Sequence, residues 1–154
     1  MSSDFSDDDV TRLRIALARI SRSVERTSAD SGYTRTQLSV LGSVVRLGQP
    51  GLAELADAEG LNPTMLSRVV GKLEAAGLLT RQVTAADRRV VEVTATPAGR
   101  ALHLRLRKRR ADLLAGQLAE LPAGQSARLQ AALPALESLA AQMLRGTRRL
   151  PVAR

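Results

Sequence analysis

The chain of 154 residues carries a formal net charge of +8, contains no cysteine, and 44% of its residues are hydrophobic. This length suits one ordinary domain with its own core, and the apolar content argues against intrinsic disorder. Without cysteine there is no thiol nucleophile, thiolate metal site or disulfide switch, and the one histidine, His103, is too few for a catalytic triad or a histidine cluster. We therefore expect no enzyme, no cofactor and no bound metal.

The sequence also limits where in the cell the protein is expected and which kind of nucleic acid it could bind. No apolar run approaches the length of a membrane span, and residues 1–4 (MSSD) lack the features of an export signal. Phe5 and Tyr33 are the only aromatic residues, which argues against stacking of unpaired bases and hence against a single-stranded target. We expect a cytoplasmic protein with no membrane partner.

Three helices are predicted before residue 60. Ser6 can cap the first, which ends at the break Ser31-Gly32. Thr34 or Thr36 opens the second, which stops at residues 48–51, and the third runs from about Leu52 to Glu59. The apolar stripe of the first helix consists of Leu13, Leu17, Ile20 and Val24. That of the second helix consists of Leu38, Leu41, Val44 and Val45.

The clearest element is a helix over residues 62–77. Asn62 suits the N-cap, Pro63 the first helical position and Gly77 a left-handed C-cap. Its buried stripe, at i, i+3, i+4 and i+7, consists of Leu66, Val69, Val70 and Leu73. The opposite face and its flanks carry Thr64, Ser67, Arg68, Gly71 and Lys72. A short polar face with two cations can enter the major groove of duplex DNA.

A hairpin is predicted next. Residues 78–83 and 90–94 are β-prone, with Leu79, Arg81 and Val83 on the half-buried face of the first strand. In the connection, Asp87 can hold the guanidinium of Arg89 for a narrow minor groove, with Arg88 as the reserve candidate. The alternative for this connection is a solvated surface loop.

Two long helices complete the chain. Thr96 and Pro97 start the fifth, which ends near Leu121-Pro122. The sixth follows Gly124, and Pro134 should kink it or mark a helix start. Leucines at helical spacing on the first and last helices can pack within one subunit or against a second copy.

The ordered motifs resemble the MarR family of bacterial transcriptional regulators. They are Leu55-Ala56, the helix 62–76 with the segment 72–79 (KLEAAGLL) that covers its end, Arg81, Asp87-Arg88-Arg89 and residues 94–100 (TATPAGR). Ala95 departs from the pattern, since that family usually has leucine before the Thr96-x-x-Gly99 step. The resemblance implies a dimer of winged-helix subunits that a small ligand or oxidation releases from DNA.

We therefore expect a mainly α fold with a small β-hairpin wing: a winged helix-turn-helix with N- and C-terminal dimerisation helices. The expected parts are residues 1–33 (dimerisation), 34–95 (DNA-binding lobe) and 96–154 (dimerisation). The expected function is a repressor that binds, as a homodimer, a near-palindrome in double-stranded DNA with half-sites about 10 bp apart. The residues expected at DNA are Asn62, Pro63, Thr64, Ser67, Arg68, Lys72, Arg81, Asp87, Arg88 and Arg89.

The alternative is a nucleoid-associated architectural protein that binds DNA by charge and shape without an effector. The net charge by itself is not evidence for DNA binding, because residues 49–94 sum to −1 and the whole excess of +8 lies after residue 94.

The basic run 105–110 (RLRKRR) has three readings: a solvated helix face, an anion site, or ion pairs with Asp7, Asp8 and Asp9. If the protein has an effector, the positive charge and the resemblance favour a small anionic or phenolic molecule. We expect it where the first, second and fifth helices meet, with Tyr33, Arg46 and Arg105 as candidate contacts.

Overall fold

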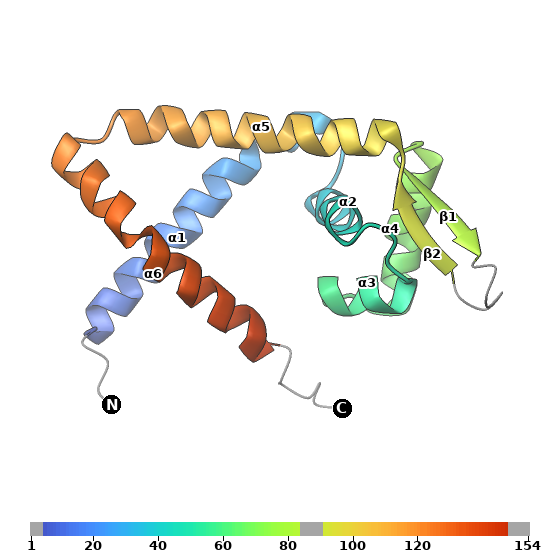
Figure 1. The fold of residues 1–154 in the computed structure, drawn as a ribbon, viewed down its shortest axis with the longest axis horizontal. Coiled ribbons are helices and arrows are strands. Elements are labelled where there is room, and N and C mark those ends of the chain that lie inside the picture. Colours follow the sequence, from blue (N-terminus) through green and yellow to red (C-terminus); the bar gives the residue numbers. More distant parts are fainter. Residues whose placement is uncertain (1–4, 84–90, 148–154) are drawn as a thin grey trace. The chain divides into compact units, whose positions relative to one another are not determined.

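The computed structural model describes residues 5–83 and 91–147, in two compact units, residues 1–113 and residues 114–154 (Figure 1). The first unit begins with α1 (Asp7–Arg26), the 3-10 helix η1 (Ala29–Ser31) and α2 (Arg35–Leu47). It continues with α3 (Leu52–Glu59), α4 (Pro63–Ala75), β1 (Leu79–Val83), β2 (Val91–Ala95) and most of α5 (Pro97–Ala119). The expected fold, mainly helical with a small hairpin, is confirmed.

The first two helices begin at capping boxes. The Ser6 side chain accepts from the backbone N–H of Asp9. The Asp9 carboxylate accepts in return from the hydroxyl and from the backbone N–H of Ser6, and these two hydrogen bonds lower the pKa of Asp9. Thr34 and Gln37 form the same arrangement, so Thr34 rather than Thr36 opens α2. The first helix ends at Arg26, before the predicted break, because the chain turns into η1 and then into the left-handed Gly32.

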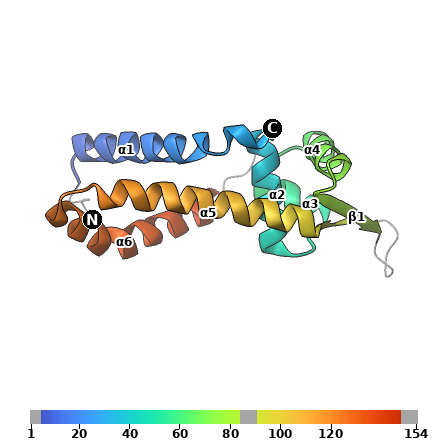
Figure 2. The ribbon, with the colours of Figure 1, turned by 90° about the horizontal axis from the view of Figure 1, so that it is seen from above.

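One core joins α2, α3, α4, the hairpin and the start of α5. Figure 2 shows the ribbon of these elements from above. The predicted stripe of α4 is confirmed, since all four of its residues are buried. In α2, Leu38, Leu41 and Val44 are buried as expected, whereas Val45 is half-buried. This core fixes the orientation of the two helices that precede the hairpin.

The two strands form an antiparallel hairpin in which Leu79 pairs with Ala95 and Val83 with Val91. Arg81 is half-buried as expected, but the expectation that Val83 would be half-buried is wrong: it is 57% exposed. Val83 lies at the open end of β1, beyond the reach of the core. The hairpin is also tied to the segment before α3, because the N–H of Val93 donates to the carbonyl of Pro50 at 3.0 Å.

Thr96 locks the start of α5 onto the end of α4. Its N–H donates to the carbonyl of Leu78 at 3.0 Å and its hydroxyl to the carbonyl of Gly77 at 2.7 Å. The same hydroxyl accepts from the N–H of Gly99 at 3.0 Å. Ala95, where the chain departs from the family pattern, is buried in the core. The residues of the Thr-x-x-Gly step are therefore the joint between the lobe and α5.

The second unit contains the end of α5 and α6 (Ala123–Thr147). Pro134 lies inside α6, so the alternative that it marks a helix start is wrong. Among the described helices, none is both long and apolar enough to cross a membrane.

Candidate functional site

The helix pair α3–α4 is joined by a three-residue turn. Gly60 ends α3 in the left-handed conformation (φ +63°), and the N–H of Leu61 donates to the carbonyl of Ala56 at 3.0 Å. Asn62 then caps α4, its side-chain oxygen accepting from the N–H of Met65 at 2.8 Å, and Pro63 occupies the first turn. At the far end Gly77 has φ +71°, as predicted. Local chemistry thus sets both ends of α4.

The outward face of α4 is polar and open. Opposite the buried stripe, the exposed residues are Asn62, Pro63, Thr64, Ser67, Arg68 and Lys72. Met65 is also exposed, at 48%, which the apolar pattern did not indicate. Gly71 is half-buried, because the Arg81 guanidinium lies over it, 3.6 Å from where a Cβ would stand.

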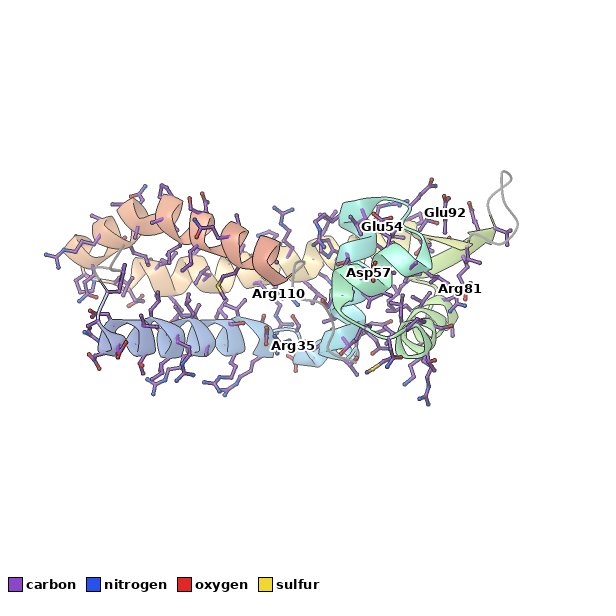
Figure 3. The ribbon with its side chains drawn as sticks, turned by 90° about the horizontal axis from the view of Figure 1, so that it is seen from below. Arg35, Glu54, Asp57, Arg81, Glu92 and Arg110 are labelled. Atoms are coloured by element: carbon purple, nitrogen blue, oxygen red, sulfur yellow. The ribbon has the colours of Figure 1, made fainter. Side chains whose placement is uncertain are left out.

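Arg81 connects the hairpin with α4 rather than pointing freely outward (Figure 3). One guanidinium nitrogen, Nη2, donates to the backbone carbonyl of Ser67 at 2.8 Å. Its Nε lies 3.4 Å from Oε2 of Glu74, a separation that makes an ion pair but no well-directed hydrogen bond. Both partners are on α4, so this arginine holds the hairpin against the exposed helix.

The predicted tip residues Asp87, Arg88 and Arg89 lie outside the described residues. The described parts of the wing are the two paired strands that lead to them.

A cavity of about 810 Å³ lies among α2, the end of α3 and α5. Of the three predicted effector contacts, Arg46 lines this cavity. Tyr33 lines a neighbouring cavity of about 210 Å³, and Arg105 lines neither of them and is exposed. The other charged or titratable side chains of the larger cavity are Glu59, His103, Arg107 and Arg110. Arg110, labelled in Figure 3, also lines the smaller cavity.

Sequence reasoning considered an anion site for the whole run 105–110, but it named Arg105 as the individual contact and not His103, Arg107 or Arg110. Positions 103, 107 and 110 share one face of a helix at i, i+4 and i+7, a spacing that could have identified them. Position 105 is about 200° away from position 107 around the helix.

For the basic run, the alternative of ion pairs with Asp7, Asp8 and Asp9 is wrong, because the run pairs instead with Asp30 and Asp112. Arg109 lies 3.2 Å from Asp30 and Lys108 lies 2.8 Å from Asp112, while Arg110 donates through Nε to the buried hydroxyl of Ser28 at 3.0 Å. Asp9 instead lies 3.7 Å from Arg12, within α1. The run therefore anchors η1 to α5 and presents Arg110 to both cavities.

His103 lies directly against α2, because a Cβ on Gly42 would stand 3.3 Å from its ring. Burial lowers the pKa of His103 below 6.5, and the positive charges of Arg107, Arg110 and Arg46 lower it further. Burial and the neighbouring guanidiniums thus both favour the neutral form of the imidazole.

Comparison with known proteins connects this geometry to a family. Residues 33–91, which hold α2, α3, α4 and β1, match the MarR family. An uncharacterised HTH-type transcriptional regulator of Mycobacterium bovis is 30% identical over 109 residues, covering 71% of this chain and 76% of that protein. An HTH-type transcriptional regulator of Mycobacterium tuberculosis matches to the same extent.

Solved structures share the fold. RV1404 of Mycobacterium tuberculosis has a TM-score of 0.77 at 23% identity, over 90% of this chain and 97% of that one. A mutant of MarR from E. coli has a TM-score of 0.71 at 20% identity, over 88% and 98%. A mutant of MepR from S. aureus bound to an oligodeoxyribonucleotide has a TM-score of 0.68 at 18% identity, over 89% and 99%.

The chain therefore belongs to the MarR family. It is a DNA-binding transcriptional regulator with a winged helix-turn-helix, and this family is one of regulators, not of enzymes.

Proposed function

We propose that the protein is a repressor that binds a near-palindromic operator as a homodimer, and that α4 reads the major groove. The observation that carries this proposal is the face of α4: its polar residues are exposed together while its apolar stripe is completely buried. A helix held in this way can place short side chains against base edges without local rearrangement. The DNA-bound MepR mutant, which has the same fold, supports this reading.

The roles within α4 follow from position. Arg68 is the base-edge or nearby phosphate contact, and Lys72, one turn further along, is a phosphate contact. The remaining exposed contacts, grouped around the first turn, are Asn62, Pro63, Thr64 and Ser67.

In the wing, we propose that Arg89 enters a minor groove with Asp87 holding its guanidinium, and Arg88 stays the reserve candidate. Arg81 was expected to contact DNA, but we propose a different role for it. Because its guanidinium is engaged by Glu74 and Ser67, we assign it to positioning the wing rather than to contacting a phosphate.

Dimerisation is proposed through the terminal helices, residues 1–33 and 96–154, around a DNA-binding lobe at residues 34–95. None of the α1 residues, all of which are described, is buried, and its predicted stripe includes Leu17 at 45% and Ile20 at 51% exposure. An exposed apolar stripe on an amphipathic helix is suited to a two-fold contact with a second copy.

We propose that a small anionic or phenolic ligand can release the protein from DNA. Arg46 and Tyr33 line cavities next to α2, which supports a site near them. Arg105 lines neither of these two cavities, so we leave it out of the proposed site. We propose that the protein acts on the bacterial nucleoid in the cytoplasm, where such an operator would lie.

Selection of duplexes from a random pool, followed by titration at fixed salt, tests the proposal. A regulator should prefer its selected palindrome over random duplex by at least about 10³-fold. Equal affinity for both, with a steep dependence on salt, would instead support the architectural alternative.

A further inference from the structure

The outward face of α4 is bordered by two edges, and the hairpin occupies one of them. On that edge the Arg81 guanidinium meets the carbonyl of Ser67, the backbone at Gly71 and the carboxylate of Glu74. The residues of the other edge share one side of the helix at i, i+3 and i+7 and are all exposed. They form the open edge of α4, which consists of Met65, Arg68 and Lys72.

Met65 is the apolar member of this open edge. Among the residues of α4, all of which the structure describes, it is the only large hydrophobic side chain that is exposed, at 48%. Single exposed apolar side chains are common on protein surfaces, so the significance of Met65 lies in its surroundings. It lines an open hollow of about 420 Å³ together with Asn62, Thr64 and Arg68, which are proposed to contact DNA.

The base edges in the major groove carry one kind of apolar group. It is the C5-methyl of thymine, and the other groups that distinguish the base pairs there are hydrogen-bond donors and acceptors. Helix-turn-helix proteins contact base edges with the N-terminal residues of their second helix, and Met65 is the third residue of α4. The unbranched, polarisable side chain of methionine adapts its shape to a small apolar group, so Met65 suits a thymine methyl.

We propose that Met65 contacts the C5-methyl of one thymine in each half-site of the operator and is therefore a specificity-determining residue. The inference rests on the proposed function, and it adds the base that is read and the side chain that reads it. Met65 and Arg68 are about 4.5 Å apart along the helix axis, and successive base pairs are about 3.4 Å apart. The thymine should thus lie within about two base pairs of the group that Arg68 contacts.

Replacement of thymidine by deoxyuridine tests this contact, because deoxyuridine lacks the C5-methyl and keeps the hydrogen-bonding groups of the base. The selected palindrome is prepared with deoxyuridine at each thymine in turn, symmetrically in both half-sites. Each duplex is titrated with the full-length protein at one salt concentration. We expect one position at which the native chain loses about fourfold in affinity for each half-site, which is the value of burying one methyl-sized group.

The variant that tests the side chain is Met65→Gln, which keeps the length but removes the apolar end. It should bind the thymine palindrome more weakly than the native chain does, and it should bind the thymine and deoxyuridine forms equally well. Met65→Leu keeps an apolar side chain and should retain most of the preference for thymine.

Leu47→Gln is the matched control, because it introduces the same glutamine at another exposed apolar position of the lobe, the end of α2. It should keep the native preference for thymine. All three variants should stay close to the native denaturation midpoint, since both positions are exposed.

Two results would overturn this contact while the proposed function stands. One is a selected palindrome whose affinity for the native chain is unaffected by deoxyuridine at every position, or whose half-sites contain no thymine. The other is an equal loss on the deoxyuridine duplex in the native chain and in Met65→Gln, which would assign the methyl contact to another side chain. If no duplex is bound in preference to random DNA, the proposed function fails and the contact fails with it.

Discussion

The guanidinium of Arg81, on the first strand of the hairpin, donates a hydrogen bond of 2.8 Å to the backbone carbonyl of Ser67, in the middle of α4. Glu74, two turns further along the same helix, lies 3.4 Å from the Nε of this arginine. The wing and the exposed helix are therefore connected through one side chain, and the position of each depends on the other.

Arg81→Gln should lower the free energy of unfolding by about 1–2 kcal/mol, because a charged hydrogen bond to a carbonyl and a half-buried ion pair are both lost. Thermal denaturation at a fixed protein concentration should show a midpoint lower by a few degrees. Gln82→Ala, the adjacent exposed position on the same strand, is the control and should stay close to the native midpoint. An unchanged midpoint in Arg81→Gln would refute its positioning role.

Gly99→Ala should be more damaging, because a Cβ at this position would stand 2.1 Å from the backbone carbonyl oxygen of Leu78. The oxygen belongs to the turn that Thr96 fixes, so relief requires a backbone shift and costs about 2 kcal/mol or more. The matched control is Gly116→Ala in the same helix, where nothing lies within 4 Å of the new Cβ. That variant should gain up to about 1 kcal/mol from helix propensity. Similar denaturation midpoints for the two variants would contradict the close contact.

The parts predicted from sequence are those that local chemistry decides. Asn62, Pro63 and Gly77 set the ends of α4 by capping, and its apolar stripe has one consistent period. The end of α1 was misplaced because the short turn η1 carries no comparable signal.

The partners of Arg81 and most of the cavity lining were not predicted, because they depend on how separate elements pack. Spacing groups positions 103, 107 and 110 on one face of α5, but it does not say which face meets α2. Arg105 and Arg107 look equivalent in the basic run, and only the packing of α5 on α2 shows that Arg107 lines the cavity.

Ile20→Asp should convert the proposed dimer into a monomer, because it places a charge in the middle of the exposed apolar stripe of α1. Molar mass from light scattering during size-exclusion chromatography measures this directly. Thr11→Asp introduces the same charge on the polar side of α1 and should leave the mass of a dimer. A native chain that is already monomeric at micromolar concentration would refute dimerisation.

Lys72→Gln should weaken binding to all duplexes to a similar degree, because a phosphate contact carries no sequence information. The slope of log affinity against log salt should become flatter by about one unit. Affinities measured at several salt concentrations on selected and random duplexes give this slope. Loss of affinity on the selected duplex alone would show that Lys72 contacts a base instead.

The most direct measurement of whether α4 reads duplex DNA is the affinity of Arg68→Ala for the selected palindrome and for random duplex at one salt concentration. Arg105→Ala serves as the control, because it removes the same charge from an exposed position on α5. We predict that Arg68→Ala loses about 1–3 kcal/mol on the palindrome and much less on random duplex, with an unchanged denaturation midpoint. A folded Arg68→Ala protein that binds the palindrome as tightly as the native chain and Arg105→Ala do would contradict this account.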